Sequence, residues 1–70
     1  MDSYLVIYEK SKEGYSAYVP DLPGCTSAGK SKQEIKTNIT EAIRLYLEVL
    51  KEEGESIPHT KSESEIVTVS

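Results

Sequence analysis

The sequence predicts an α+β domain, with one long helix packed on a small, mostly antiparallel sheet in the order β-β-β-α-β. Three observations predict it: a β-branched and aromatic run over residues 4–9, an alternating segment over residues 15–19, and apolar residues at helical spacing after Ser31. With 70 residues, the chain has room for one core, so we expect residues 1–70 to form a single domain.

The first two strands are expected to form a hairpin. Residues 4–9 read YLVIYE, and a polar connection that ends in Gly14 leads to the returning segment YSAYV. Pro20 ends this second strand because it has no backbone N–H to donate to a ladder. The pair Pro23-Gly24 then favours a turn, after which residues 25–27 are short and β-tolerant and are expected to form a third strand that Gly29 ends.

A helix is expected to begin at Ser31, because Ser31 and Glu34 have the spacing of a capping box. Gly54 lies where the residue just beyond the helix would be. The expected buried stripe comprises Ile35, Ile39, Ala42, Ile43, Tyr46, Leu47 and Leu50.

Residues 65–70 read EIVTVS and predict a final strand after a polar connection that contains Pro58. A strand reached by a helical crossover is usually parallel to its neighbour, and the right-handed crossover favours a place beside the first strand.

The charge balance favours a protein partner. The formal net charge is −4, from 12 acidic and 8 basic side chains, and the basic ones form no run. Nucleic-acid binding requires clustered Lys and Arg, so direct binding to DNA or RNA is not expected. An acidic surface suits a basic partner protein. No stretch is apolar enough for a membrane span, and the expected location is the cytoplasm.

Small size predicts self-association. A chain of this length buries a small core, and one cysteine with one histidine provides neither an intrachain disulfide nor a four-ligand zinc site. We therefore expect a homo-oligomer. Leu45 and Val49 lie beside the main helical stripe, where they serve either side packing or an oligomer contact.

No residue is predicted to be catalytic, to bind a cofactor or to ligate a metal. Cys25 has no neighbouring base and is interpreted as a small buried side chain, and His59 as an exposed loop residue. Asp21 lies between two prolines, where a carboxylate either fixes the loop through backbone donors or contacts a partner. The loop is the candidate partner-binding site, and its residues are Pro20, Asp21, Leu22, Pro23, Gly24 and Cys25.

Residues 24–31 also satisfy the nucleotide-binding pattern G-x-x-x-x-G-K-[ST]. A working phosphate loop follows a buried parallel strand in a larger sheet. Here a proline-rich turn precedes Gly24, and the helix has its own cap at Ser31. We therefore interpret the match as coincidental.

The sequence resembles the HicB antitoxin family in three places. The first is the order Tyr15-x-Ala-x-Val-Pro-Asp-Leu-Pro-Gly-Cys25-x-Ser-x-Gly29. The others are the segment Glu41-Ala-Ile43 and the later Gly54 and Ile57-Pro58. The resemblance implies a partial RNase H-like fold. It also implies an antitoxin that neutralises a HicA-like toxin, a small basic mRNA-cleaving ribonuclease, by masking its active or RNA-binding surface.

Many members of that family carry a further carboxy-terminal DNA-binding domain, and none is expected within residues 1–70. Two alternatives remain beside the antitoxin interpretation. One is a self-associating or small-molecule-binding regulatory domain without a toxin. The other is a metal-dependent nuclease, which would need several carboxylates to converge, whereas the acidic residues of this chain are scattered.

Overall fold

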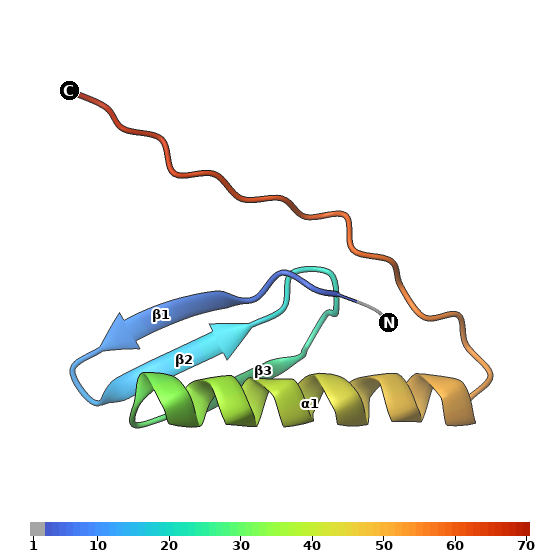
Figure 1. Cartoon of the computed structure of the whole chain (residues 1–70). Coiled ribbons are helices and arrows are strands. Elements are labelled where there is room, and N and C mark those ends of the chain that lie inside the picture. Colours follow the sequence, from blue (N-terminus) through green and yellow to red (C-terminus); the bar gives the residue numbers. More distant parts are fainter. Residues whose placement is uncertain (1–2) are drawn as a thin grey trace.

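The computed structural model describes residues 3–70 as two layers followed by an extended segment (Figure 1). One layer is an antiparallel sheet in the order β1-β2-β3, and the other is a single helix. The elements are β1 (Ile7–Ser11), β2 (Gly14–Tyr18), β3 (Thr26–Gly29) and α1 (Lys32–Glu52). The predicted α+β class, with three antiparallel strands before one long helix, is confirmed.

β1 begins later than the sequence pattern predicts. Ile7 is opposite Tyr18 in the ladder, so residues 4–6 would have to pair with the segment that contains Pro20. That segment has already turned away from the sheet, because Pro20 has no donor and starts a turn. Residues 4–6 are therefore outside the ladder, although Tyr4 and Val6 still pack against the core.

β3 extends further than predicted, because it includes Gly29 as its last residue. Tyr15 is opposite Gly29 in the ladder. A Cβ atom at Gly29 would lie 2.8 Å from the backbone nitrogen of Ile35, so glycine allows the first turn of α1 to approach the sheet closely. Gly29 therefore ends β3 and also marks a close contact between the helix and the strand.

Ser31 and Gly54 end α1 as the sequence predicts, but the reciprocal bond of the predicted capping box is shifted by one residue. The Ser31 hydroxyl accepts the amide N–H of Glu34 at 3.1 Å, whereas the Glu34 carboxylate accepts the N–H of Lys30, one residue before the cap. At the other end Gly54 has φ +72° and donates to Lys51, while Glu55 donates to Leu50. These two bonds form a Schellman motif, which reverses the chain after α1.

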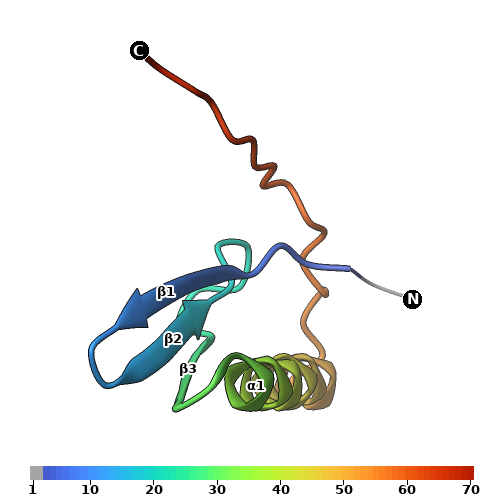
Figure 2. The same ribbon diagram turned by 60° about the vertical axis from the view of Figure 1, so that its left-hand side comes forward.

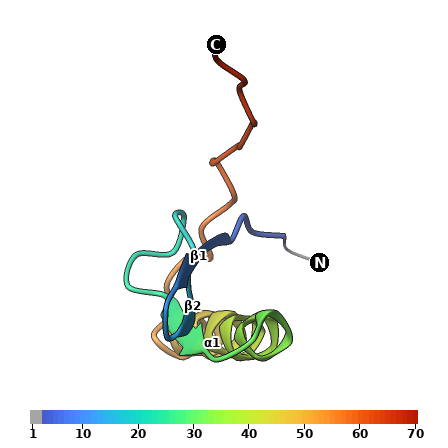
Figure 3. The same cartoon turned by 90° about the vertical axis from the view of Figure 1, so that its left-hand side faces the viewer.

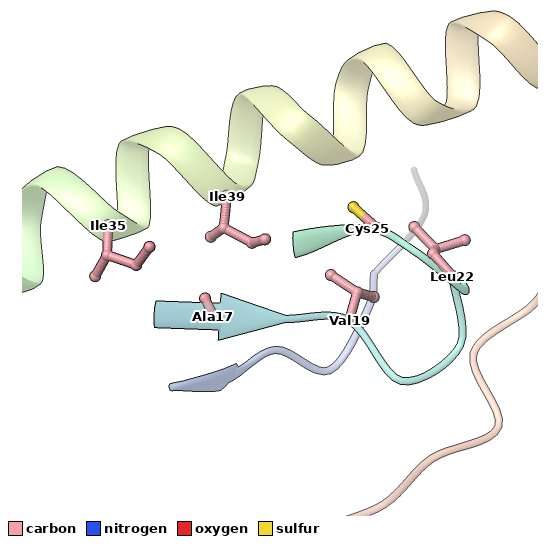
Figure 4. Close-up of a cluster of buried hydrophobic side chains, with 6 residues drawn as sticks. All are labelled: Ala17, Val19, Leu22, Cys25, Ile35 and Ile39. Carbon is pink, nitrogen blue, oxygen red and sulfur yellow. The ribbon is translucent and has the colours of Figure 1, made fainter. Parts of the chain in front are cut away.

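The core lies between the helix and the inner face of the sheet (Figure 4). In β1 and β2 the alternation places Tyr8 and Ala17, which are ladder partners, on the side that packs against the core. α1 lies across β2 and β3, with β1 at the far edge (Figure 2). The buried side chains are Ala17, Val19, Leu22, Cys25, Ile35 and Ile39.

The predicted final strand is not formed. Residues 55–70 have no regular secondary structure, and the last eight of them are exposed. From residue 63 onward the chain extends away from both layers on the side opposite α1 (Figures 1 and 3). A strand needs a partner for its backbone groups, and the chain is held elsewhere before it reaches the free edge of β1.

Candidate functional site

The loop over residues 20–25 consists of two consecutive turns. The N–H of Leu22 donates to the carbonyl of Val19 at 3.0 Å, and the N–H of Cys25 donates to the carbonyl of Leu22 at 3.0 Å. The second turn has Pro23 and Gly24 at its centre, and Gly24 has φ +83°, which is the geometry of a type II turn. A further bond from Val19 to the carbonyl of Cys25 closes the loop at its base.

The six candidate residues of this loop divide by burial. Leu22 is fully buried and Cys25 is 4% exposed, so both side chains belong to the core. Pro20, Pro23 and Gly24 are exposed. Leu22 therefore anchors the loop from inside, while the prolines and the glycine form its outer surface.

Asp21 binds a segment that lies far away in the sequence. Its carboxylate accepts the backbone N–H of Lys61 at 3.0 Å and that of Ser62 at 3.1 Å. It also accepts the hydroxyls of Thr60 at 3.1 Å and Ser62 at 3.0 Å. We call this set of four hydrogen bonds the Asp21 clamp. The sequence left two roles open to Asp21, fixing the loop or contacting a partner. In the structure the carboxylate fixes the loop to residues 60–62.

The clamp also changes the acidity of its carboxyl group. The backbone N–H groups of Lys61 and Ser62 hold the pKa of Asp21 below its usual value, and the hydroxyls of Ser62 and Thr60 act in the same direction. Desolvation opposes them and is outweighed. Asp21 thus favours its ionised form, the carboxylate that accepts the hydrogen bonds of the clamp.

Cys25 is confirmed as a buried residue of the core. Burial raises the pKa of its thiol, which keeps the sulfur in the less nucleophilic protonated form. Its neighbours in the core are apolar side chains such as Val19 and Leu22.

A shallow groove lies between the loop and the carboxy-terminal half of α1, and we call it the helix groove. Its apolar lining includes Leu45 and Val49, which are 53% and 51% exposed. The loop side is formed by residues 24–26. The structure thus brings together two sets that the sequence suggested separately, the loop and the off-stripe pair on the helix.

One end of the helix groove is acidic. Glu53 and Glu55 line it where the chain reverses after α1. Both side chains are exposed. An apolar floor beside two carboxylates suits a partner that presents an apolar side chain next to basic ones.

The nucleotide-binding pattern over residues 24–31 does not form a phosphate loop. Thr26 to Gly29 are β3, so the backbone groups that would surround a phosphate belong to a strand paired with β2. Ser31 is the helix cap. The interpretation of the match as coincidental agrees with this geometry.

Within residues 3–70, no three His, Cys, Asp or Glu side chains gather closely enough to hold a metal ion. His59 is exposed. In the same range no helix has both the length and the apolar character to cross a membrane.

One further contact was not foreseen from the sequence. The Tyr4 hydroxyl donates a hydrogen bond to the carbonyl of Pro58. Together with the Asp21 clamp, it binds the segment after α1 to the sheet end at which β1 begins. A tyrosine in a predicted strand and a proline in a polar connection give no sequence pattern that pairs them, so only the fold reveals the contact.

The amino-acid sequence of this chain is similar to those of known proteins. Residues 4–69 match the family model of the HicB-like antitoxin of bacterial toxin-antitoxin systems. A UPF0150 protein of Thermoplasma acidophilum is 49% identical over 61 residues, which cover 86% of this chain and 88% of that protein. A UPF0150 protein of Archaeoglobus fulgidus is 46% identical over 57 residues, which cover 77% of this chain and 83% of that protein.

A solved structure is also similar. A chain of the HicA3 and HicB3 toxin-antitoxin complex superimposes with a TM-score of 0.72 and 33% sequence identity. The match covers 86% of this chain and 70% of that one. The likeness therefore extends over most of the chain.

Proposed function

We propose, because the chain belongs to the HicB-like antitoxin family of bacterial toxin-antitoxin systems, that it binds and neutralises a HicA-like toxin. The expected partner is a small basic ribonuclease that cleaves mRNA. The observation that carries the proposal is the family match over residues 4–69. The likeness to a chain of the HicA3 and HicB3 complex supports it.

The charge of the chain supports a basic partner. The net charge is −4, and Glu53 and Glu55 line one end of the helix groove. Complementary potentials accelerate encounter and disfavour wrong partners. A ribonuclease must present a positive surface to its RNA, and an acidic protein that covers this surface competes directly with the substrate.

The proposed contact surface combines the loop with the helix groove. Pro20, Pro23 and Gly24 supply exposed backbone and ring surface, and the Asp21 clamp holds them in place. Leu22 and Cys25 contribute by fixing the shape of the loop from the core. A surface that is already ordered loses little conformational entropy on binding.

Masking is the proposed mode of inhibition. The antitoxin contributes shape, apolar surface and negative charge, and it performs no reaction and requires no cofactor. Inhibition is then stoichiometric and is reversed when the complex dissociates.

Co-expression of the chain with the protein encoded by the adjacent gene tests the proposal. We expect co-purification of a small basic protein, and we expect its cleavage of mRNA to cease at one equivalent of this chain. Recovery of this chain alone, or a complex that still cleaves mRNA at full rate, would contradict the antitoxin role.

A further inference from the structure

Residues 63–70 have the composition of a strand but pair with nothing in the structure. Four consecutive residues, 66–69, are β-branched. Ile66 is 96% exposed, Val67 69% and Val69 85%. Apolar side chains this exposed, in a row, normally belong to an interface.

The sheet offers a matching place. β1 is an outer strand, and among residues 3–70 no strand pairs with its second edge. Leu5, Val6, Ile7 and Tyr8 are apolar, so both faces of the sheet are apolar where β1 begins. An open edge of this kind is a template for another strand.

The chain's own contacts direct the segment away from its own β1. Pro58 lies beside Tyr4, and a chain continuing from there along β1 would fill the free edge. Instead the Asp21 clamp holds residues 60–62 at the β2-β3 loop, and the residues that follow point away from the sheet (Figures 1 and 2).

We propose that residues 63–70 add as a strand to the free β1 edge of a second copy of this chain. Eight residues span about 26 Å when extended, which is long enough to cover β1, Ile7–Ser11, along its whole edge. The exchange is reciprocal, because each copy has one such segment and one β1 edge to which no described strand is paired. A two-fold dimer then uses both segments and both β1 edges.

The side chains fit this arrangement. In a strand Val67 and Val69 lie on one face while Ile66 and Thr68 lie on the other. At the start of β1, Ile7 and Tyr8 present apolar side chains on its two faces, and the polar residues 9–11 follow. The proposal concerns self-association and does not depend on the proposed toxin, so either can fail while the other holds.

Isotope-filtered NMR on a mixture of two labelled preparations tests the exchange. One preparation carries 13C-labelled Ile and Val methyl groups, the other is 15N-labelled, and the two are equilibrated together at high concentration. We expect cross-peaks between the methyl groups of Ile66, Val67 and Val69 and the β1 amides of the other copy. Cross-peaks found only within one copy would overturn the proposal in favour of pairing with the chain's own β1, and an absence of cross-peaks at β1 would overturn it altogether.

The mass in solution gives a second test. Sedimentation equilibrium is expected to show a dimer for the unaltered chain, and Val67→Pro, which removes a ladder donor, is expected to raise the dimer dissociation constant about tenfold or more. Helical circular dichroism reports whether the body remains folded, since the substitution lies outside all regular elements. The matched control Leu45→Ser/Val49→Ser alters the helix groove and is expected to leave the dimer intact. A monomer at all concentrations, or a dimer lost with the control and kept with Val67→Pro, would overturn the proposal.

Discussion

The carboxylate of Asp21 accepts a hydrogen bond from the backbone N–H of Ser62 at 3.1 Å, across a separation of 41 residues. The bond joins a tight loop to a segment that lacks secondary structure. Asp21 therefore controls where that segment leaves the body of the protein.

The clamp is expected to weaken in acid. Because the pKa of Asp21 is lowered in the folded chain, its contribution to stability is fully present above the usual carboxyl value of 3.8. It is lost as the pH falls through the lower folded value. In a 1H-15N titration the amide signals of Lys61 and Ser62 should shift together, with a midpoint below 3.8. A midpoint above that value would contradict the clamp.

Substitution of Asp21 by Asn is expected to release residues 60–62. The amide keeps the size of the side chain and loses its charge, so the bonds to the two backbone donors weaken. Amide exchange at Lys61 and Ser62 should accelerate, while exchange at Ile39 in the core stays unchanged. Glu48→Gln, at an exposed position of α1, is the matched control. If the amides of residues 61–62 exchange as slowly in Asp21→Asn as in the unaltered chain, contacts other than the clamp hold the segment.

Substitution by Ala is expected to destabilise the chain more than Asn at Gly24, and less than Asn at Gly29. Gly24 has φ +83° with open space around its Cα, so Ala costs about 1 to 2 kcal/mol and Asn, which tolerates this conformation, costs less. Gly29 packs against the backbone of Ile35, so Ala costs about 1 to 3 kcal/mol and the larger Asn costs more. Urea unfolding of the four variants gives the free energy of unfolding of the Ala and Asn variants at each position. The same order at both positions would refute one of the two explanations.

Cys25 is expected to resist alkylation in the folded chain. Its thiol is buried and its pKa is raised, so the reactive thiolate is both scarce and inaccessible. Iodoacetamide labelling should be slow in buffer and should accelerate at the urea concentration that unfolds the chain. Rapid labelling of the folded chain would place Cys25 at the surface.

Leu45→Ser/Val49→Ser is expected to weaken toxin binding while leaving the fold stable. Both side chains are about half exposed, so their removal costs stability little, but they form the apolar floor of the helix groove. We expect the dissociation constant of the toxin complex to rise about tenfold or more in calorimetric titration. Lys36→Ala, on an exposed part of α1 outside that groove, is the control. Unchanged affinity would remove the helix groove from the contact surface.

The elements that sequence predicted well are those determined by local chemistry. Ser31 and Gly54 fix the ends of α1, and the spacing of Ile35 and Ile39 fixes its buried face. The Pro23-Gly24 turn likewise depends on neighbouring residues only. Each of these signals lies within a few residues of the structure it specifies.

The features that sequence did not predict depend on distant partners. Residues 65–70 have strand composition, but whether a strand forms depends on where the chain is held beforehand. That is decided by Tyr4 with Pro58 and by the Asp21 clamp, which join residues 39 to 54 positions apart. The division of the loop into buried Leu22 and exposed Pro23 likewise follows from tertiary packing.

The separation between local and distant contacts also bears on how the chain folds. The three strands are joined by short connections and α1 follows directly, so most pairing involves nearby residues. Proteins rich in such contacts fold quickly. The segment that reaches Asp21 must close a loop of about forty residues and gains few bonds in return. We therefore expect the sheet and helix to assemble in one fast phase, and residues 58–62 to dock afterwards as a separate, weaker step.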